Sequence, residues 1–221
     1  MRKNVKKQLA LRVLSTAALV AMVSSIATAA FAAEYNVTKG SVDILAEGGK
    51  QYITQWEDKD NNLCVKDGEG KDIRDREDSD ITLTTKDKAT DETETTSNTV
   101  TIDAKEGNTA NVTLKNVHIE VDTTKAKSGA IEIKGNGNTN LELNGDNIVL
   151  SGNSNHPGIE KADVNGTGTL TIKDDVNDDG SEKTGTEADT TGKLVAGGCH
   201  QSAAIGGGGT SDTACTSNIK I

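Results

Sequence analysis

The sequence is poor in aromatic residues and in proline. Aromatic side chains make up 2% of its 221 residues, and proline occurs once. This scarcity excludes a globular core built on aromatic rings. The plentiful Gly, Asn, Thr and Asp instead favour many short strands joined by tight turns. A chain of this length suits one solenoid, or a small cap followed by a solenoid.

The motifs of several chemistries are also missing. The three cysteines have no C-x-x-C spacing, which argues against a zinc site. The glycine run at 206–209 lacks the Lys-Ser/Thr pair of a phosphate-binding loop, so nucleotide binding is not supported. After residue 33, arginine occurs only as Arg74 and Arg76, and the carboxylate pair Asp174-Asp175 begins a loop instead of lying on a rigid strand. We therefore expect no enzyme.

Residues 1–33 differ from the rest of the chain. Five basic residues accompany an apolar run at 13–26, and small residues follow, with Ala30-Phe31-Ala32 as an A-x-A cleavage site. This pattern predicts a secretory signal peptide. A membrane anchor fits less well because the apolar run is short and ends in small residues.

Removal of residues 1–33 leaves the chain strongly acidic. Five of the 24 basic residues and none of the 34 acidic residues are lost, so 19 basic residues remain and the net charge becomes −15. Such a surface repels nucleic acid and other polyanions unless a cation intervenes. We expect a secreted or cell-surface chain that binds no nucleic acid and does not remain in the membrane after cleavage.

A regular repeat runs through residues 111–172, with a period of 141 − 112 = 29. Its apolar positions recur as Val112 and Leu114, Leu141 and Leu143, Leu170 and Ile172, as Ile119 and Val121, Ile148 and Leu150, and with a period one shorter as Ile131 and Ile159. Each period holds three short runs in which apolar and polar residues alternate, and alternation predicts strands with one buried face.

One such coil cannot bury its own apolar face, so successive coils must stack. The pattern therefore predicts an all-β chain folded as a right-handed parallel β-helix, a solenoid. We predict one inward ladder of Val112, Leu141 and Leu170. A second inward ladder holds Ile119 and Ile148.

The third period arrives late. Leu194 follows its predicted equivalent Ile148 by 194 − 148 = 46, and Ile205 follows Ile159 by the same interval. Both displacements predict a single insertion with a length of 46 − 29 = 17. The stretch that contains it, 173–192, is acidic and almost free of apolar residues.

The domain layout follows from these patterns. We predict a signal peptide at 1–33, a small N-terminal β cap with a charged loop at 34–80, and the β-helix at 81–221. Ile219 begins a further coil in which the sequence stops, so we expect a truncated helix that belongs to a longer protein and is monomeric as part of it.

The aromatic residues of the exported chain cluster at its start. Tyr35, Tyr52 and Trp56 all precede the charged loop. One interpretation is a β cap that covers the first coil, and the other is a platform on which sugar rings stack. We favour the cap.

The acidic insertion contains the start of a calcium-binding pattern. Asp175, Asn177 and Asp179, followed by Gly180, match D-x-[DN]-x-[DN]-G, in which alternate oxygens converge on a hard cation. The twelfth position is Thr186 instead of the expected Glu. We name these three residues as candidate calcium ligands, with a solvated acidic loop as the alternative.

The cysteines allow one disulfide. Cys199 and Cys215 flank the last turn, and export favours oxidation, so these two can bridge the closing coil. Cys64 then stays unpaired or pairs elsewhere. Three small buried thiols are the alternative.

The coils and the end of the chain carry a family resemblance. They hold the runs Val112-Thr-Leu-Lys-Asn-Val-His-Ile-Glu-Val121, Gly129-Ala-Ile-Glu-Ile133, Gly192-Lys-Leu-Val-Ala-Gly-Gly198, Ala203-Ala-Ile-Gly-Gly-Gly-Gly209 and Ser217-Asn-Ile-Lys-Ile221. With the signal peptide, these runs resemble large secreted surface proteins of Gram-positive bacteria. The coils also resemble the polygalacturonate-binding β-helix family of carbohydrate-binding domains, and this resemblance implies calcium and anionic polysaccharide.

We expect a secreted, non-catalytic surface domain that binds a polysaccharide or cell-wall glycan, with calcium as a possible bridge to an anionic polymer. A structural or adhesive stalk segment of a larger surface protein is the alternative. A polysaccharide lyase of the same fold fits less well.

Overall fold

The computed structural model describes residues 33–122, 128–152, 155–161, 167–174, 192–208 and 218–221. The regular elements in these segments are strands, apart from one 3₁₀ turn, η1 (Val37–Lys39). No helix among them has the length and apolar character needed to cross a membrane. The predicted all-β class is confirmed.

The strands form three sheets. The six-stranded sheet runs in the order β1 (Glu34–Asn36), β6 (Ile81–Thr84), β9 (Thr109–Lys115), β12 (Asn138–Asn144), β15 (Leu170–Lys173), β18 (Ile219–Lys220). The four-stranded sheet runs β16 (Lys193–Gly197), β13 (Asp146–Ser151), β10 (His118–Val121), β7 (Thr95–Thr96). The eight-stranded sheet runs β17 (Ile205–Gly206), β14 (Ile159–Lys161), β11 (Ile131–Lys134), β8 (Val100–Ala104), β2 (Ser41–Glu47), β3 (Lys50–Asp58), β4 (Leu63–Cys64), and β5 (Arg76–Glu77) also pairs with β3.

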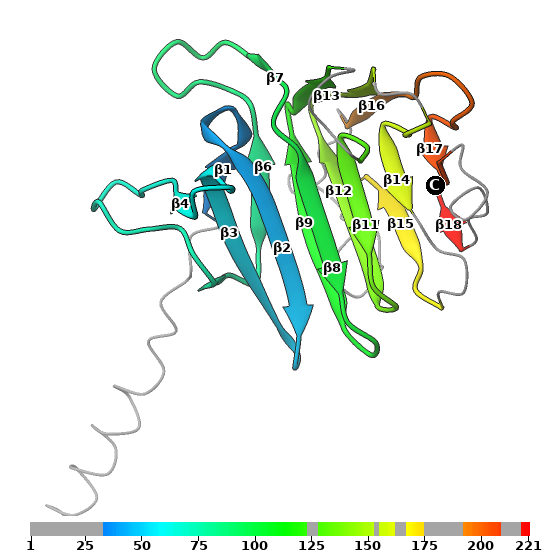
Figure 1. Cartoon of the computed structure of the whole chain (residues 1–221), viewed down its shortest axis with the longest axis horizontal. Helices are drawn as coiled ribbons and strands as arrows, with labels where there is room; N and C mark the ends of the chain where they lie inside the picture. The colour runs from blue at the N-terminus through cyan, green and yellow to red at the C-terminus, as the bar shows by residue number, and fades with distance from the viewer. Residues whose placement is uncertain (1–32, 123–127, 153–154, 162–166, 175–191, 209–217) are drawn as a thin grey trace, which may run out of the picture. The chain divides into compact units, whose positions relative to one another are not determined.

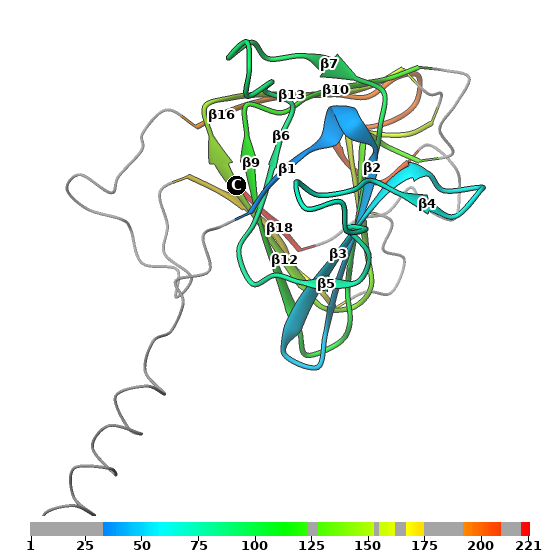
Figure 2. The same cartoon turned by 90° about the vertical axis from the view of Figure 1, so that its left-hand side faces the viewer.

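Each pass of the chain adds one strand to each sheet. β9, β10 and β11 are followed by β12, β13 and β14, and then by β15, β16 and β17, so strands of successive passes lie side by side in chain order (Figure 1). All neighbours in the six-stranded and four-stranded sheets are parallel. Figure 2, which views the sheets from their first strands, shows the three sheets arranged around a common interior.

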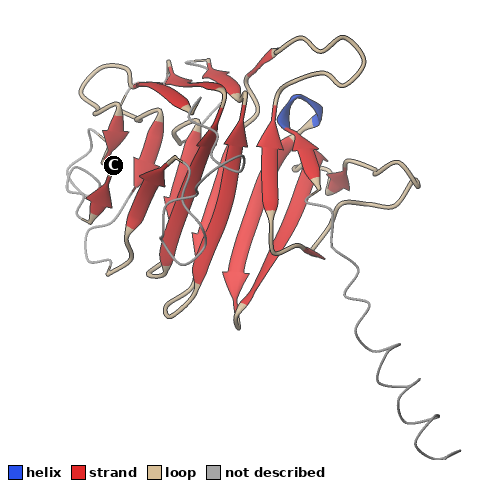
Figure 3. Ribbon diagram, turned by 180° about the vertical axis from the view of Figure 1, so that it is seen from behind, coloured by secondary structure: helices blue, strands red, loops and turns tan. Residues whose placement is uncertain are grey.

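The interior is filled by branched aliphatic side chains from all three sheets. In the eight-stranded sheet, Ile44 pairs with Ile102, which pairs with Ile133, and all three are at most 4% exposed. Burial of one such side chain contributes about 1.5–3 kcal/mol. The alternation of buried and outward residues along strands such as β2, β8, β9 and β12 supplies much of this core. Seen from behind, the described part of the chain is almost entirely strands and loops (Figure 3).

The first predicted ladder is confirmed in part. Leu141 pairs with Val112, as the period of the sequence predicts, and both are buried. Leu170, however, pairs with Thr139, and Leu141 pairs with Ile172. The second pass is thus slightly longer in this sheet than the sequence period. Because side chains alternate with a period of two, Leu170 stays on the buried face and only its place in the ladder is wrong.

The second predicted ladder is wrong. Ile119 pairs with the fully buried Val149, whereas Ile148 pairs with His118 and lies on the outer face. A shift of one residue exchanges the two faces of a strand. The cause is Asn147, the second residue of β13, which is 1% exposed and takes the first inward position of that strand.

The late third pass is confirmed in the eight-stranded sheet, where Ile205 pairs with Ile159 as predicted. In the four-stranded sheet, Leu194 pairs with Asn147 instead of Ile148, so the displacement there is longer by one position. The inward Asn147 also accounts for this difference.

The connection from the six-stranded to the four-stranded sheet varies in length. Two residues, Asn116 and Val117, join β9 to β10, and Gly145 alone joins β12 to β13. Residues 174–192, most of which lie outside the described segments, join β15 to β16. Nevertheless β16 pairs with β13 over five consecutive residue pairs. The register of the following strand is therefore independent of the length of this connection.

Parallel pairing begins before residue 81. β1 pairs with β6, and β2 pairs with β8, in the same direction as the later passes. β3 then turns back as a hairpin and pairs antiparallel with β2, β4 and β5. Residues 34–80 thus supply strands of the parallel sheets as well as the antiparallel segment at one edge.

Candidate functional site

The aromatic residues after residue 33 divide between the core and the surface. Tyr35 is 3% exposed, and its O–H donates to Asp78 Oδ2 at 2.8 Å. The pKa of Tyr35 is raised, mainly because the phenol is buried and secondly because of this hydrogen bond. Tyr52 and Trp56 stand at outward positions of β3 and are both partly exposed. Tyr35 is therefore structural, whereas Tyr52 and Trp56 each keep part of their ring accessible, although Arg74 lies over the Trp56 ring.

In-register pairing places side chains from four strands in rows on the outer face of the eight-stranded sheet. One row holds Tyr52, Leu45, Asp103 and Lys134, and the next holds Thr54, Asp43, Thr101 and Glu132. Neighbouring strands lie about 4.8 Å apart. Residues that are distant in the sequence therefore line one continuous surface.

A hollow of about 360 Å³ opens over these rows. Its volume is within the range of roughly 300–1,000 Å³ that is usual for ligand sites. The rings of Tyr52 and Trp56 line it, together with five charged side chains: Asp43, Lys59, Asp75, Asp103 and Lys134. We call this surface the aromatic hollow.

The ring of Trp56 is held from two sides. Its Nε1–H donates to Asp43 Oδ2 at 2.7 Å, and Lys59 Nζ donates to the same oxygen at 2.7 Å. The guanidinium of Arg74 lies 5.0 Å from the ring centroid, a distance typical of a cation–π contact. These contacts fix the orientation of the indole before any ligand arrives.

Asp75 is fixed beside the hollow by Thr54. The Thr54 hydroxyl donates to Asp75 Oδ1 at 3.3 Å, and the backbone N–H of Asp75 donates to Thr54 Oγ1 at 2.9 Å. Asp75 has a φ of 44°, a conformation that Asp and Asn tolerate better than other non-glycine residues. The side chain remains exposed, so its carboxylate can meet a ligand.

The lysines at the far side of the hollow are bound to carboxylates. Lys105 Nζ donates to Asp103 Oδ2 at 2.6 Å, and this hydrogen bond raises the pKa of Lys105. Lys134 Nζ lies 2.9 Å from Glu132 Oε2. The lysines and most of the carboxylates of the hollow therefore already have partners, and the exposed Asp75 is the carboxylate most open to a ligand.

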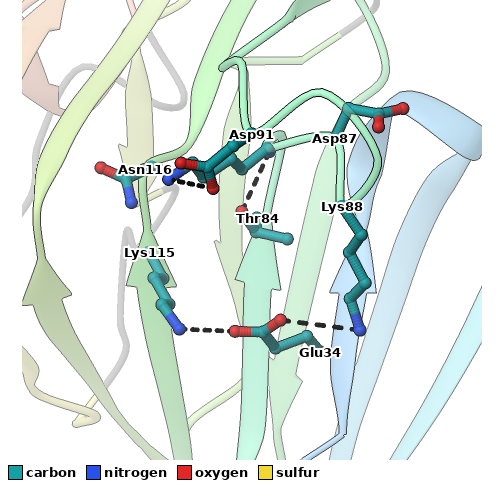
Figure 4. A pocket seen from close by; sticks show the side chains of 8 residues that line it. Glu34, Thr84, Asp87, Lys88, Asp91, Lys115 and Asn116 are labelled. Carbon is teal, nitrogen blue, oxygen red and sulfur yellow. Dashed lines mark hydrogen bonds and ion pairs between the residues drawn. The ribbon is translucent and has the colours of Figure 1, made fainter.

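A second cavity, of about 280 Å³, lies beside β1, β6 and β9 and is lined by charged residues (Figure 4). Glu34 lines it between two lysines, 2.6 Å from Lys115 Nζ and 3.7 Å from Lys88 Nζ. The hydrogen bond from Lys115 is the main reason that the pKa of Glu34 is lowered. Glu34 is therefore ionised at neutral pH and is a poor general acid.

A third hollow, open and about 490 Å³ in volume, lies beside β7 and β10 of the four-stranded sheet. Its lining includes Thr95, Thr96 and Glu120, but no aromatic ring. His118 lies on the same strand as Glu120 and pairs with Thr95. Of the three hollows, only the first combines aromatic faces with several polar groups.

The metal ligands expected from the sequence, Asp175, Asn177 and Asp179, lie outside the described residues, as does Cys215. The calcium site and the Cys199–Cys215 disulfide remain predictions. Within the described segments, no group of three or more His, Cys, Asp or Glu side chains is arranged to hold a metal ion. Cys64 is 6% exposed, burial raises the pKa of its thiol, and it forms no disulfide with Cys199.

The sequence indicated the aromatic pair but not its polar partners. Asp43, Asp103 and Lys134 come from three strands, and only the register between passes brings them together. The alternating pattern around each of these residues predicts that its side chain points outward, but it does not identify the residues of other strands that lie beside it. Comparisons of the chain with family models, with curated proteins and with solved structures found no match.

Proposed function

We propose that the protein is a secreted, non-catalytic surface domain that binds carbohydrate through the aromatic hollow. The observation that carries this proposal is the pair Tyr52 and Trp56. Both rings lie on the outer face of β3 and line the same hollow as the carboxylates of Asp43, Asp75 and Asp103. Aromatic faces bind the apolar C–H face of a sugar ring, and carboxylates accept hydrogen bonds from its hydroxyl groups. The secreted location rests on the sequence of residues 1–33.

We also propose that the three sheets are the faces of a right-handed parallel β-helix. The support is the repeated pass through all three sheets, with parallel pairing between successive passes. A connection that returns to a parallel neighbour in the same sheet is right-handed in nearly all proteins. A left-handed path in an experimental structure would contradict this proposal.

The absence of catalysis is supported by the state of the charged groups. Arg76 lies 2.6 Å from Asp67, and Arg74 binds Asn62 and covers Trp56. Glu34 is occupied by Lys115. These partners leave the groups named here poorly suited to transfer a proton to or from a sugar.

Calcium-dependent binding of an anionic polysaccharide remains a separate part of the proposal. It rests on Asp175, Asn177 and Asp179 and on the net charge of the exported chain, which should repel a polyuronate without a bridging cation. Affinity electrophoresis in gels with polygalacturonate, with and without calcium, tests it. Retardation only with calcium, lost in the double variant Asp175→Ala, Asp179→Ala, is the expected result. Equal mobility in all gels would reject this part.

A stalk segment is the second candidate, and one surface favours it. The outer face of the six-stranded sheet repeats small polar side chains from pass to pass, and Asn140 Nδ2 donates to Asn111 Oδ1 at 2.8 Å. Such a ladder rigidifies a stack without offering a site. Absence of binding to any glycan would favour the stalk.

The test of carbohydrate binding compares the protein with the double variant Tyr52→Ala, Trp56→Ala on an array of glycans. We expect binding to be lost in the variant and kept in the control Thr171→Ala, which lies on the outer face of the six-stranded sheet. Circular dichroism of both variants establishes that the fold persists. Unchanged binding by the double variant would place the site elsewhere.

A further inference from the structure

We infer that the aromatic hollow selects an uncharged glycan and discriminates against uronic acid chains and amino-sugar chains. This inference rests on the proposed carbohydrate binding and names the ligand class of that site. It concerns the hollow alone, and the calcium-dependent binding of a polyuronate would need a different surface.

The first argument is the balance of hydrogen-bond donors and acceptors. Three carboxylates, Asp43, Asp75 and Asp103, line the hollow. Asp43 already accepts from Trp56 and Lys59. Asp103 accepts from Lys105 and has its other oxygen buried, so the exposed Asp75 is the main acceptor for a ligand. An ionised carboxylate can only accept hydrogen bonds. Its complement is a ligand rich in hydroxyl donors. A uronate adds a further acceptor that would face these carboxylates.

The second argument is that the cations are already engaged. Lys59 lies 2.7 Å from Asp43, and Lys134 lies 2.9 Å from Glu132. A uronate could bind either lysine only in competition with an existing carboxylate partner. An uncharged sugar can accept from the same lysines without breaking these contacts.

The third argument is the apolar surface. Leu45 pairs with Tyr52 on the neighbouring strand, so an aliphatic and an aromatic side chain adjoin on the floor of the hollow. Tyr52 and Trp56 are four residues apart on one strand, about 13 Å at the usual rise. This separation exceeds the length of one sugar unit, so the two rings suit non-adjacent units of a chain that runs along β3.

An amino-sugar polymer is the main competitor, because its ammonium groups would be attracted to the carboxylates. The salt bridges argue against it. Since Asp43 already binds Lys59 and Asp103 binds Lys105, an ammonium group would have to compete with these lysines for the carboxylates. The uncharged glycan avoids both conflicts.

The experiment is a titration of the purified protein, in the presence of a chelator, with uncharged, galacturonate and amino-sugar chains of matched length. We expect an uncharged chain to bind at least tenfold more tightly than either charged chain. Tyr52→Ala should weaken this binding about tenfold, the effect of losing one aromatic contact. Preference for a charged chain would overturn the inference and leave the proposed function intact. Binding to none of the chains would overturn both.

A charge-neutralising variant tests the role of the carboxylates. Asp75→Asn keeps a residue that tolerates the positive φ, and it should reduce the preference for the uncharged chain over galacturonate roughly tenfold. Asp91→Asn makes the same change of net charge at a side chain that is 86% exposed and does not line the hollow. An equal effect of both variants would mean that overall charge, and not the hollow, sets the preference, and would overturn the inference.

Discussion

Asn147 lies buried near the corner between the six-stranded and four-stranded sheets, where its side-chain amide forms hydrogen bonds to backbone groups. Its Nδ2 donates to the carbonyl oxygens of Asn144, Gly145 and Lys193, each at 3.2 Å, and its Oδ1 accepts from the N–H of Val117 at 3.0 Å. The amide thus connects three successive passes. A single side chain fixes which face of β13 is buried.

Replacing this amide by a carboxylate should destabilise the fold. Asn147→Asp preserves shape but removes both donated hydrogens and places a charge among carbonyl oxygens, so we expect the free energy of unfolding to fall by at least about 1–3 kcal/mol. Urea unfolding measures the change. Asn218→Asp, at an exposed position, is the control and should have a much smaller effect. Equal effects would mean that the corner contacts contribute little.

Tyr35 predicts how stability changes in alkali. Burial and Asp78 raise the pKa of its phenol above the value of about 10 in the unfolded chain, so folding favours the protonated form. The contribution of this group is therefore complete below about pH 10 and is lost as the pH rises further. We expect the free energy of unfolding to fall above pH 10 less steeply in Tyr35→Phe than in the unmodified protein. Parallel pH profiles would contradict this assignment.

At the scale of elements, β3 depends on a close approach to Gly40. A Cβ added there would lie 2.0 Å from the carbonyl oxygen of Trp56. Gly40→Ala should therefore displace β3, cost about 1–3 kcal/mol and weaken glycan binding, since Trp56 is part of the hollow. Gly68→Ala is the matched control, because nothing lies within 4 Å of its added Cβ. Thermal unfolding and the glycan titration, applied to both variants, give the comparison.

The positions of the strands were predictable from the sequence, whereas the pairing between passes was predictable only in part. Alternation located the strands, and the repeated short motif around Ile131, Ile159 and Ile205 identified three residues that pair in register from pass to pass. The 29-residue period failed for Ile119 and Ile148 because Ile119 pairs with Val149, one position later, where the inward Asn147 shifts the register. Corner geometry depends on backbone hydrogen bonds that no apolar pattern records.

The candidate site was predictable only in its aromatic half. Tyr52 and Trp56 stand four residues apart in an alternating stretch, so their shared face could be inferred from local sequence. Asp103 and Lys134 are neighbours only through the pairing of β8 with β11, which depends on the length of an entire pass. The acidic insertion falls largely outside the described residues, and its role remains a prediction.

At the scale of the whole molecule, charge should oppose folding. Residues 34–221 carry a net charge of −15, so this part of the chain repels itself, and exposed ion pairs such as Lys71–Glu69 offset little of that repulsion. We expect the urea midpoint to rise between about 0.01 and 0.15 M salt, as screening lengths shorten. The less acidic variant Glu92→Lys, Glu94→Lys should show a smaller rise. A midpoint that falls with salt would mean that ion pairs dominate.

The variable corner between the six-stranded and four-stranded sheets has a consequence for engineering. The frame accepts one, two or nineteen residues at equivalent corners and still pairs the next strand in register. The paired strands thus tolerate changes in this connection. Foreign peptides grafted between β12 and β13 should be displayed on the surface at the position of that pass along the sheets. Several grafts at successive corners would then form an array with the spacing of neighbouring strands, about 4.8 Å.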